Sequence, residues 1–289
     1  DREIAVLEGP VISSLSEGAS ARWNNSGTKL FLFTPEIEDA IIWGPNEENI
    51  TMLPHDRSVR GVSWSPNDLT LASWTWDGVV YLWDSENETL ISRIERELDI
   101  KDVIWTDDAV NFAIIEGNGT RQAISLFHSS NGEMIPLNDP DPGSIISSSS
   151  YAFFNNDGTS LIYCTGYGAK MWNTRTGDLL GLFQHTEEYP GLDSGCALNA
   201  NDSQLITWDS ESNDVNVWDI DNGEKAYTLS HSEGLLGAFW KPDSTQILTW
   251  TEYGTSYIWD SRNGEVVIEL KPEIAGGQLD HFNATWSSE

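Results

Sequence analysis

The chain has little positive charge. Its 289 residues include 15 Lys and Arg against 46 Asp and Glu, which gives a formal net charge of −31. A surface of this sign repels phosphate backbones and anionic headgroups, and no basic stripe offsets the repulsion. Nucleic acid and anionic membrane surfaces are therefore not expected as partners. The acidity fits a solubilising surface, and it leaves cation adsorption, adaptation to high salt or a basic partner open.

Long apolar runs are absent as well, and cysteine is scarce. No apolar stretch approaches the roughly 20 residues that a membrane helix needs, so we expect no membrane insertion. The two cysteines, Cys164 and Cys196, are too few for a zinc site, and no pair of histidines flanks either at ligand spacing. Two small buried residues is the simpler interpretation. A disulfide is possible only if the fold brings their α-carbons within about 7 Å.

The sequence also lacks the short motifs of common catalytic sites. It has no Gly-x-Ser-x-Gly elbow, no phosphate-binding glycine loop, no His-Glu-x-x-His and no calcium loop of the Asp-x-Asp-x-Asp-Gly type. Adjacent carboxylates such as Glu187 and Glu188 are common in any chain this acidic and carry almost no weight. We therefore expect no enzyme, no cofactor and no metal site.

Aromatic residues, in contrast, are abundant and regularly spaced. The chain contains 14 Trp, and similar segments such as "GVSWSPND" (61–68) and "GAFWKPDS" (237–244) recur along it. The residues that mark these segments stand 41 to 49 positions apart, at Trp23, Trp64, Trp105, Phe154, Leu198, Trp240 and Trp286. Self-similarity at such a period indicates a repeat architecture.

A second short segment recurs once in each repeat. It ends in Trp-Asp in "YLWD" (81–84), "NVWD" (216–219) and "YIWD" (257–260), and in related residues in the other three repeats. Each repeat carries four short alternating apolar runs separated by Gly, Asn, Asp and Ser, which is typical of strands, and no segment has a convincing helical period. Four strands in a unit of about 40 to 45 residues is the pattern of a propeller blade.

On these residues the chain resembles the WD-repeat β-propeller family, and most of all its Trp-rich bacterial versions. The resemblance covers nearly the whole chain. It implies an all-β fold, a β-propeller of four-stranded antiparallel blades, in a single domain over residues 1–289 with a flexible loop at 136–150. It also implies that rings such as Trp83, Trp218 and Trp259 are almost fully buried between blades, where they fill the wedge between neighbouring sheets.

The family carries a hydrogen-bonded tetrad of His, Ser or Thr, Asp and Trp in its regular blades. Of the predicted blades, only the second has all four members, which the resemblance assigns to His55, Ser73, Asp77 and Trp83. The fifth blade offers His185, Thr207 and Trp218 with Asn213 or Asp214 near the turn, and the sixth offers His231, Thr249 and Trp259 with Tyr253 in place of the acid. Because these residue types recur at one offset, we interpret them as structural and not as a hydrolase triad.

The two ends of the chain predict an incomplete seventh blade beside six complete ones. Residues 3–8 match the outer strand at 265–270, and 280–286 match an inner strand, so the closing blade lacks its two middle strands. Three interpretations stay open: a sequence cut from a longer array, a ring of six blades with two spare strands, or a partner that supplies the missing pair. The candidate inter-chain edge consists of Ile4, Val6, Leu7, Phe282, Ala284 and Trp286.

The function that the resemblance implies is a non-catalytic protein-interaction scaffold. The interruption "PLNDPDPGSIISSSS" (136–150) is the candidate binding loop, through Asp139, Asp141 and Ser144. The alternative is a self-assembling structural subunit of an extracellular layer or filament. The chain begins at Asp1 without an initiator Met or signal-peptide pattern, so a processed protein, an excised domain or a trimmed sequence stay open.

An extracellular or cell-surface setting is favoured over the cytoplasm by six Asn-x-Ser/Thr sites, although an Asn- and Ser-rich chain produces such sites by chance. They lie mostly in predicted turns, where a sugar could attach. The candidate glycosylation sites are Asn24, Asn49, Asn87, Asn118, Asn201 and Asn283.

Overall fold

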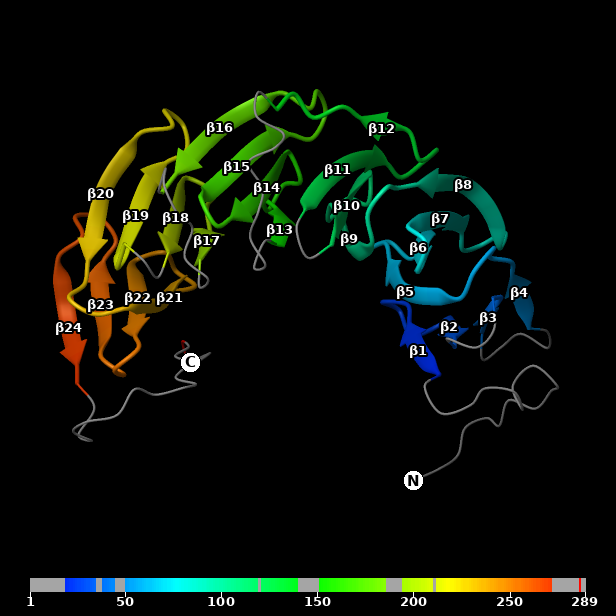
Figure 1. Cartoon of the computed structure of the whole chain (residues 1–289), viewed down its shortest axis with the longest axis horizontal. Coiled ribbons are helices and arrows are strands. Elements are labelled where there is room, and N and C mark those ends of the chain that lie inside the picture. The colour runs from blue at the N-terminus through cyan, green and yellow to red at the C-terminus, as the bar shows by residue number, and fades with distance from the viewer. Residues whose placement is uncertain are drawn as a thin grey trace. The chain divides into compact units, whose positions relative to one another are not determined.

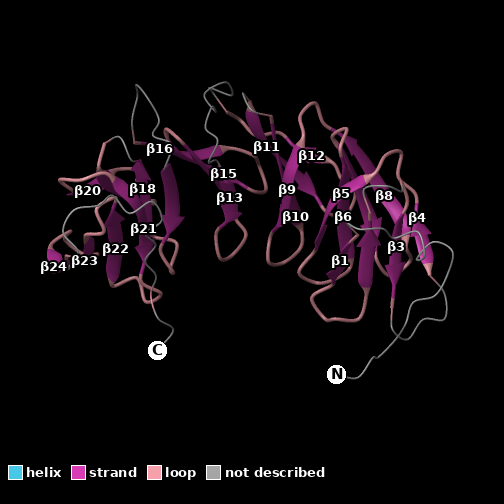
Figure 2. Cartoon of the chain, turned by 60° about the horizontal axis from the view of Figure 1, so that its bottom comes forward, coloured by secondary structure: helices cyan, strands magenta, loops and turns pink. Residues whose placement is uncertain are grey.

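The computed structural model describes residues 19–34, 38–44, 50–118, 121–139, 151–185, 194–209, 212–271 and 286. Within these ranges the chain forms strands and turns and no helix (Figure 2). The strands make six four-stranded sheets, and in each sheet the strands lie side by side in sequence order (Figure 1). The strand pairs are antiparallel, which confirms the predicted all-β class and the four-stranded repeat.

The first compact unit spans Asp1–Asn118 and Ala123–Pro136 and holds the first three sheets. The first sheet contains β1 (Ser20–Trp23), β2 (Leu30–Phe33), β3 (Ala40–Trp43) and β4 (Thr51–Leu53). The second contains β5 (Val59–Trp64), β6 (Thr70–Thr75), β7 (Val79–Asp84) and β8 (Thr89–Glu95). The third contains β9 (Ile100–Trp105), β10 (Asn111–Gly117), β11 (Gln122–His128) and β12 (Met134–Ile135).

The second compact unit spans Gly119–Gln122 and Leu137–Glu289 and holds the last three sheets. The fourth sheet contains β13 (Tyr151–Phe154), β14 (Ser160–Thr165), β15 (Gly168–Asn173) and β16 (Leu179–Gln184). The fifth contains β17 (Ser194–Leu198), β18 (Gln204–Asp209), β19 (Asp214–Asp219) and β20 (Lys225–Ser230). The sixth contains β21 (Leu235–Trp240), β22 (Gln246–Thr251), β23 (Ser256–Asp260) and β24 (Val266–Leu270).

The second and third strands of the sheets form the core. Every residue of β14 is buried, and so are five of the six residues of both β6 and β7. A strand that is covered on both faces needs apolar side chains on both, which explains near-continuous runs such as "SLIYCT". The fourth strands are more exposed, and every residue of β24 is exposed.

The aromatic rings are buried between consecutive sheets within each unit, as predicted. Trp83 is 3% exposed, Trp259 6% and Trp218 9%. Trp83 belongs to an apolar cluster with Phe31 and Leu53 of the preceding sheet. Trp218 and Trp259 belong to the clusters between the fourth and fifth sheets and between the fifth and sixth. The rings are therefore core.

A glycine lies under a tryptophan in three of the sheets. Gly61, Gly195 and Gly237 of the first strands pair with Trp74, Trp208 and Trp250 of the second strands. A β-carbon added to any of these glycines would lie 2.2 to 2.3 Å from the Cζ2 atom of the indole. Only glycine lets the ring lie flat across the first strand at these positions.

The turns between the first and second strands connect neighbouring sheets. The Asp68 carboxylate accepts hydrogen bonds from the backbone N–H groups of Asn25 at 2.7 Å and Ser26 at 2.8 Å. In the second unit the Asp202 carboxylate accepts from Asn156 N–H at 3.0 Å in the same way. Both aspartates have positive φ, which Asp tolerates better than most residues. Adjacent sheets are thus tied at one end by charge-assisted hydrogen bonds.

Candidate functional site

Three of the four predicted tetrad residues form one hydrogen-bonded chain in the second sheet. The indole N–H of Trp83 donates to Ser73 Oγ at 2.9 Å, and Ser73 Oγ lies 2.7 Å from His55 Nε2. His55 Nδ1 lies 2.8 Å from the carbonyl oxygen of Leu53. Because a carbonyl can only accept, Nδ1 carries a proton. Both ring nitrogens of His55 therefore have hydrogen-bond partners.

Asp77, the fourth predicted member, has a different partner. Its Oδ1 atom accepts from Thr75 Oγ1 at 2.6 Å. The Nδ1 atom of His55 is bound to the carbonyl oxygen of Leu53, and Nε2 is bound to Ser73. The acid therefore ties the turn between β6 and β7 to the end of β6 and is not part of the His–Ser–Trp chain.

Burial lowers the pKa of His55 to about 4, although the Leu53 carbonyl and nearby carboxylates favour the cation. In the unfolded chain the imidazole titrates near its ordinary value of about 6.5. We expect His55→Ala to lower the free energy of unfolding at pH 7 by about 1 to 3 kcal/mol, because Ser73 loses a buried partner. The loss should be measured by denaturant unfolding at several pH values.

The loss on His55→Ala should shrink between pH 6.5 and pH 4. In that window the unfolded wild type binds a proton at His55 that the folded protein excludes. The free energy of unfolding of the wild type therefore decreases as the pH is lowered, and the variant lacks this contribution. His128→Ala is the matched control, since His128 stands in the Trp-Asp position of a degenerate repeat and bonds Asn111 at 3.0 Å on a half-buried site. Equal losses for the two variants would contradict the assignment.

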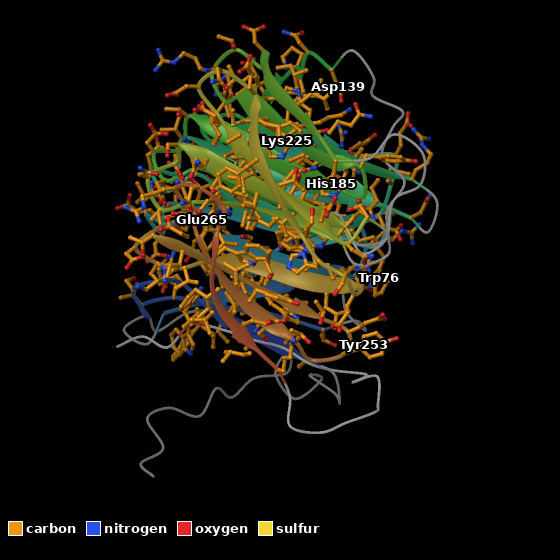
Figure 3. The ribbon with its side chains drawn as sticks, turned by 90° about the vertical axis from the view of Figure 1, so that its left-hand side faces the viewer. Trp76, Asp139, His185, Lys225, Tyr253 and Glu265 are labelled. Carbon is orange, nitrogen blue, oxygen red and sulfur yellow. A yellow bond between two sulfur atoms is a disulfide. The ribbon has the colours of Figure 1, made fainter. Side chains whose placement is uncertain are left out.

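The fifth and sixth sheets repeat this series of Trp–Ser–His hydrogen bonds, with threonine in place of serine. Trp218 N–H donates to Thr207 Oγ1 at 2.8 Å, and Trp259 N–H donates to Thr249 Oγ1 at 2.9 Å. His231 Nε2 lies 2.7 Å from Thr249 Oγ1, and His185 Nδ1 (labelled in Figure 3) lies 3.2 Å from Thr207 Oγ1. Burial lowers the pKa of both histidines.

The acid of the fifth sheet is Asp209, which the sequence interpretation missed. Its Oδ2 atom lies 3.2 Å from His185 Nε2, and both side chains are 1% exposed. Asn213 and Asp214 were the residues expected there, because the family places the acid in the turn. Asp209 instead closes β18 and directly follows Trp208, so a second Trp-Asp pair in "LITWD" was the available signal.

The two cysteines are buried, as predicted, and they are also bonded to each other. Cys164 of β14 and Cys196 of β17 form a disulfide with their α-carbons 5.6 Å apart. Beside it, the Tyr151 hydroxyl donates to the Cys196 carbonyl at 2.6 Å and accepts from the Cys196 N–H at 2.9 Å. The fourth and fifth sheets are thus joined covalently and by two hydrogen bonds.

Of the three residues predicted to bind a partner in this loop, only Asp139 lies within the described residues. Its carboxylate (labelled in Figure 3) accepts from Lys170 Nζ at 2.9 and 3.1 Å. The Asp139 side chain is 11% exposed and the Lys170 side chain 7%, so the ion pair is largely buried. Asp139 anchors the chain before β13 to the middle of β15. Asp141 and Ser144 lie outside the described residues, and so does the rest of the loop at 140–150.

The predicted inter-chain edge falls almost wholly outside the described residues. Ile4, Val6, Leu7, Phe282 and Ala284 are not described, and the incomplete seventh blade that they would form stays a prediction. Trp286 is described: its ring centroid lies 6.0 Å from Lys241 Nζ, directly after β21.

The predicted glycosylation sites differ in their surroundings. Asn24 is buried, and its amide nitrogen donates to Ser26 Oγ and Thr28 Oγ1, so a sugar there would break the turn. Asn87, Asn118 and Asn201 are exposed. Asn49 and Asn283 lie outside the described residues.

The second unit contains a cavity of about 560 Å³ beside the first strands of its three sheets. Its aromatic walls come from all three sheets, and the turns after β13 and β17 add amides and one carboxylate. The lining residues are Tyr151, Phe153, Phe154, Asn155, Asn156, Cys196, Ala197, Leu198, Asn199, Ala200, Asp202, Trp208 and Phe239. An apolar cavity of this size with a few polar groups is typical of a ligand site.

In the described part of the chain, no group of three or more His, Cys, Asp or Glu side chains could hold a metal ion. No helix long and apolar enough to cross a membrane occurs in the same residues.

Comparison with known proteins agrees with the repeat pattern. The chain is 25% identical over 228 residues to WD repeat-containing protein 1 of Bos taurus, which covers 74% of this chain and 35% of that protein. It is 22% identical over 271 residues to Periodic tryptophan protein 2 of Arabidopsis thaliana, covering 90% of this chain and 29% of that protein. The chain thus spans about a third of the length of these relatives. No protein-family model matches it.

Among solved structures, the chain resembles the crystal structure of the C-terminal WD40 domain of Sif2. The TM-score is 0.52 at 16% identity, over 84% of this chain and 66% of that one. At this identity the likeness concerns the fold alone. The Trp–Ser/Thr–His hydrogen bonds, the four-stranded sheets, the sequence relatives and the structural neighbour agree: the chain is similar in sequence to WD-repeat proteins and has a β-propeller fold.

Proposed function

We propose that this protein is a non-catalytic scaffold that binds other proteins. The observation that carries the proposal is the use of its polar residues. In the second, fifth and sixth sheets a buried tryptophan donates to the serine or threonine, and the same hydroxyl bonds the histidine, so these groups hold the sheet together. A nucleophile would stand at one position and face a substrate, whereas these groups recur and face the core.

The turns between second and third strands offer contact points for a partner. Trp76 is 58% exposed and Tyr253 is 49% exposed, each in such a turn (Figure 3). One face of Trp76 is covered by the Arg60 guanidinium, 4.3 Å from the ring centroid, which holds the ring in place. Exposed, preorganised aromatic rings are the side chains that most often dominate protein interfaces. The net charge of −31 favours a basic partner.

The test is capture of partners from the native source on immobilised protein, followed by binding of the purified partner. Trp76→Ala should weaken binding at least about tenfold, as for a hot-spot residue. Leu90→Ala is the control, because Leu90 is also an exposed apolar side chain, on β8 and 47% exposed. Binding should also weaken as salt is raised. Absence of any specific protein partner, or turnover of a substrate, would contradict the proposal.

The alternative, a self-assembling extracellular subunit, has two observations in its favour. The disulfide fits an oxidising compartment. In addition, Leu270 of β24 is 53% exposed, whereas Ile94 and Leu229, at the equivalent positions of the second and fifth sheets, are 8% and 0% exposed. Val266, Val267 and Ile268 of the same strand are exposed too. An apolar outer strand of this kind is suited to contact with a second copy.

Measurement of the native particle's mass separates the two proposals. A self-assembling subunit should form oligomers that become monomers, still folded, when residues 1–9 are deleted. If those residues serve only within one chain, the deletion should lower the melting temperature without changing the particle mass. A protein that stays monomeric at high concentration would rule out assembly.

A further inference from the structure

At three boundaries a tryptophan at the end of a first strand reaches the preceding sheet. Its indole N–H donates to a residue of that sheet's first strand, the one immediately before the position that corresponds to the tryptophan. The pairs are Trp64 to Arg22 O at 3.4 Å, Trp105 to Ser63 Oγ at 3.0 Å and Trp240 to Ala197 O at 3.0 Å. Each pair lies within one compact unit. The indole thus bridges neighbouring first strands by shape and by one hydrogen bond.

The fifth sheet lacks this bridge to the fourth. Leu198 of β17 stands where the first, second, third and sixth sheets have tryptophan, and leucine is smaller and has no N–H to donate. By the same register, the acceptor in the fourth sheet would be Phe153, which precedes Phe154 on β13. Leu198, Phe153 and Phe154 all line the 560 Å³ cavity. The cavity therefore opens where the chain's own indole is missing.

The two sheets are held apart at a defined distance. The disulfide between Cys164 and Cys196 and the two hydrogen bonds between Tyr151 and Cys196 take over the connection that the indole makes elsewhere. Such a covalent and hydrogen-bonded strut prevents the sheets from collapsing onto Leu198. The cavity is thus preorganised, which lowers the entropy lost when a ligand enters.

The cavity's polarity limits what can enter. Among its lining residues the charged group is Asp202, and its carboxylate already accepts from Asn156 N–H at 3.0 Å and Asn156 Nδ2 at 2.8 Å. Phe239, 43% exposed, forms an aromatic wall at the side of the sixth sheet and packs against Trp250 with ring centroids 5.2 Å apart. An anionic ligand would meet no cation among the lining residues, whereas a flat aromatic group without negative charge fits the walls.

We propose that this cavity binds a tryptophan side chain presented by a partner protein, whose indole takes the place that Leu198 leaves open. The indole N–H would have the Phe153 carbonyl available as its acceptor, as Trp240 has Ala197. The inference deepens the proposed scaffold function and rests on it, because it names the chemistry of one partner contact.

The probe for this proposal is N-acetyl-tryptophanamide, with N-acetyl-leucinamide as the apolar control, and saturation-transfer NMR as the readout. The wild type should bind the tryptophan amide at millimolar concentration and the leucine amide at least tenfold more weakly. Leu198→Trp should abolish the binding and raise the melting temperature, because the chain then fills its own cavity. Leu90→Trp, which adds an indole on β8 of the second sheet, should leave binding unchanged. A wild type that ignores the probe, or equal binding by Leu198→Trp, would overturn the proposal.

A second variant covers the possibility that Leu198→Trp does not fold. Phe239→Ser removes an exposed wall of the cavity and should weaken binding of the tryptophan amide at least about fivefold, and unchanged binding would overturn the proposal. The protein partner provides the final arm. If a captured partner stays bound to folded Leu198→Trp, the scaffold function stands and the cavity is not its contact. If it is released by Leu198→Trp and kept by Leu90→Trp, both proposals are supported.

Discussion

Trp83→Ala is expected to lower the free energy of unfolding by about 3 to 5 kcal/mol, as for a large aromatic side chain removed from a packed core. Trp83 is 3% exposed and packs between the first and second sheets with Phe31 and Leu53. Its ring also stacks on Tyr81 with centroids 6.1 Å apart. Truncation leaves a cavity and deprives Ser73 of the indole N–H. Equilibrium unfolding in guanidinium chloride measures the loss.

The matched control is Trp76→Ala, in the turn between β6 and β7 of the same sheet. Trp76 is 58% exposed, so its truncation should change stability by no more than about 0.5 kcal/mol. The comparison separates burial of the ring from the chemistry of tryptophan. A loss at Trp83 as small as that at Trp76 would contradict the assignment of the rings to the core, and so would iodide quenching of most of the tryptophan fluorescence.

The double variant Cys164→Ala, Cys196→Ala is expected to lose about 3 to 4 kcal/mol of stability under oxidising conditions. The bond closes a loop over a sequence separation of 32 residues, and in the chain-entropy account the loss follows from the freedom that the unfolded chain regains. Alanine is preferable to serine, because a serine hydroxyl at these buried positions would need a new partner. Melting temperature and denaturant unfolding are the measurements.

Reduction supplies the control for the cysteine prediction. A thiol reductant should destabilise the wild type to about the level of the double variant and should leave the double variant unaffected. Two thiols that titrate in the folded, unreduced protein would contradict the bond. Loss of the disulfide should also weaken binding of the tryptophan amide, since the strut that holds the fourth and fifth sheets apart would be gone.

The sequence by itself determined the repeat, the strand content and most of the core. The 41- to 49-residue spacing of Trp64, Trp105 and Trp240 and the recurring Trp-Asp pairs predicted four-stranded sheets with rings between them. The links from Trp83 to Ser73 and from Ser73 to His55 were predictable from the resemblance to the WD-repeat family, whose tetrad includes these residue types. Side-chain alternation and the pairing of consecutive strands involve residues that are close in sequence, so the local sequence predicts them. Repetition of the pattern strengthens that prediction.

Only the tertiary structure decided which residues meet across two sheets. Asp209 at the end of β18 lies beside His185 in place of the expected Asn213 and Asp214, and the turn contributes Ser212, whose Oγ lies 2.7 Å from His185 Nε2. The bond between Cys164 and Cys196 and the hydrogen bonds from Tyr151 join residues that are 32 and 45 positions apart on different sheets, and the cavity beside Leu198 also involves Phe239 of the sixth sheet. Such contacts depend on how far neighbouring sheets stand from each other. That distance is set by the summed volume of all the side chains between them, and no single motif records it.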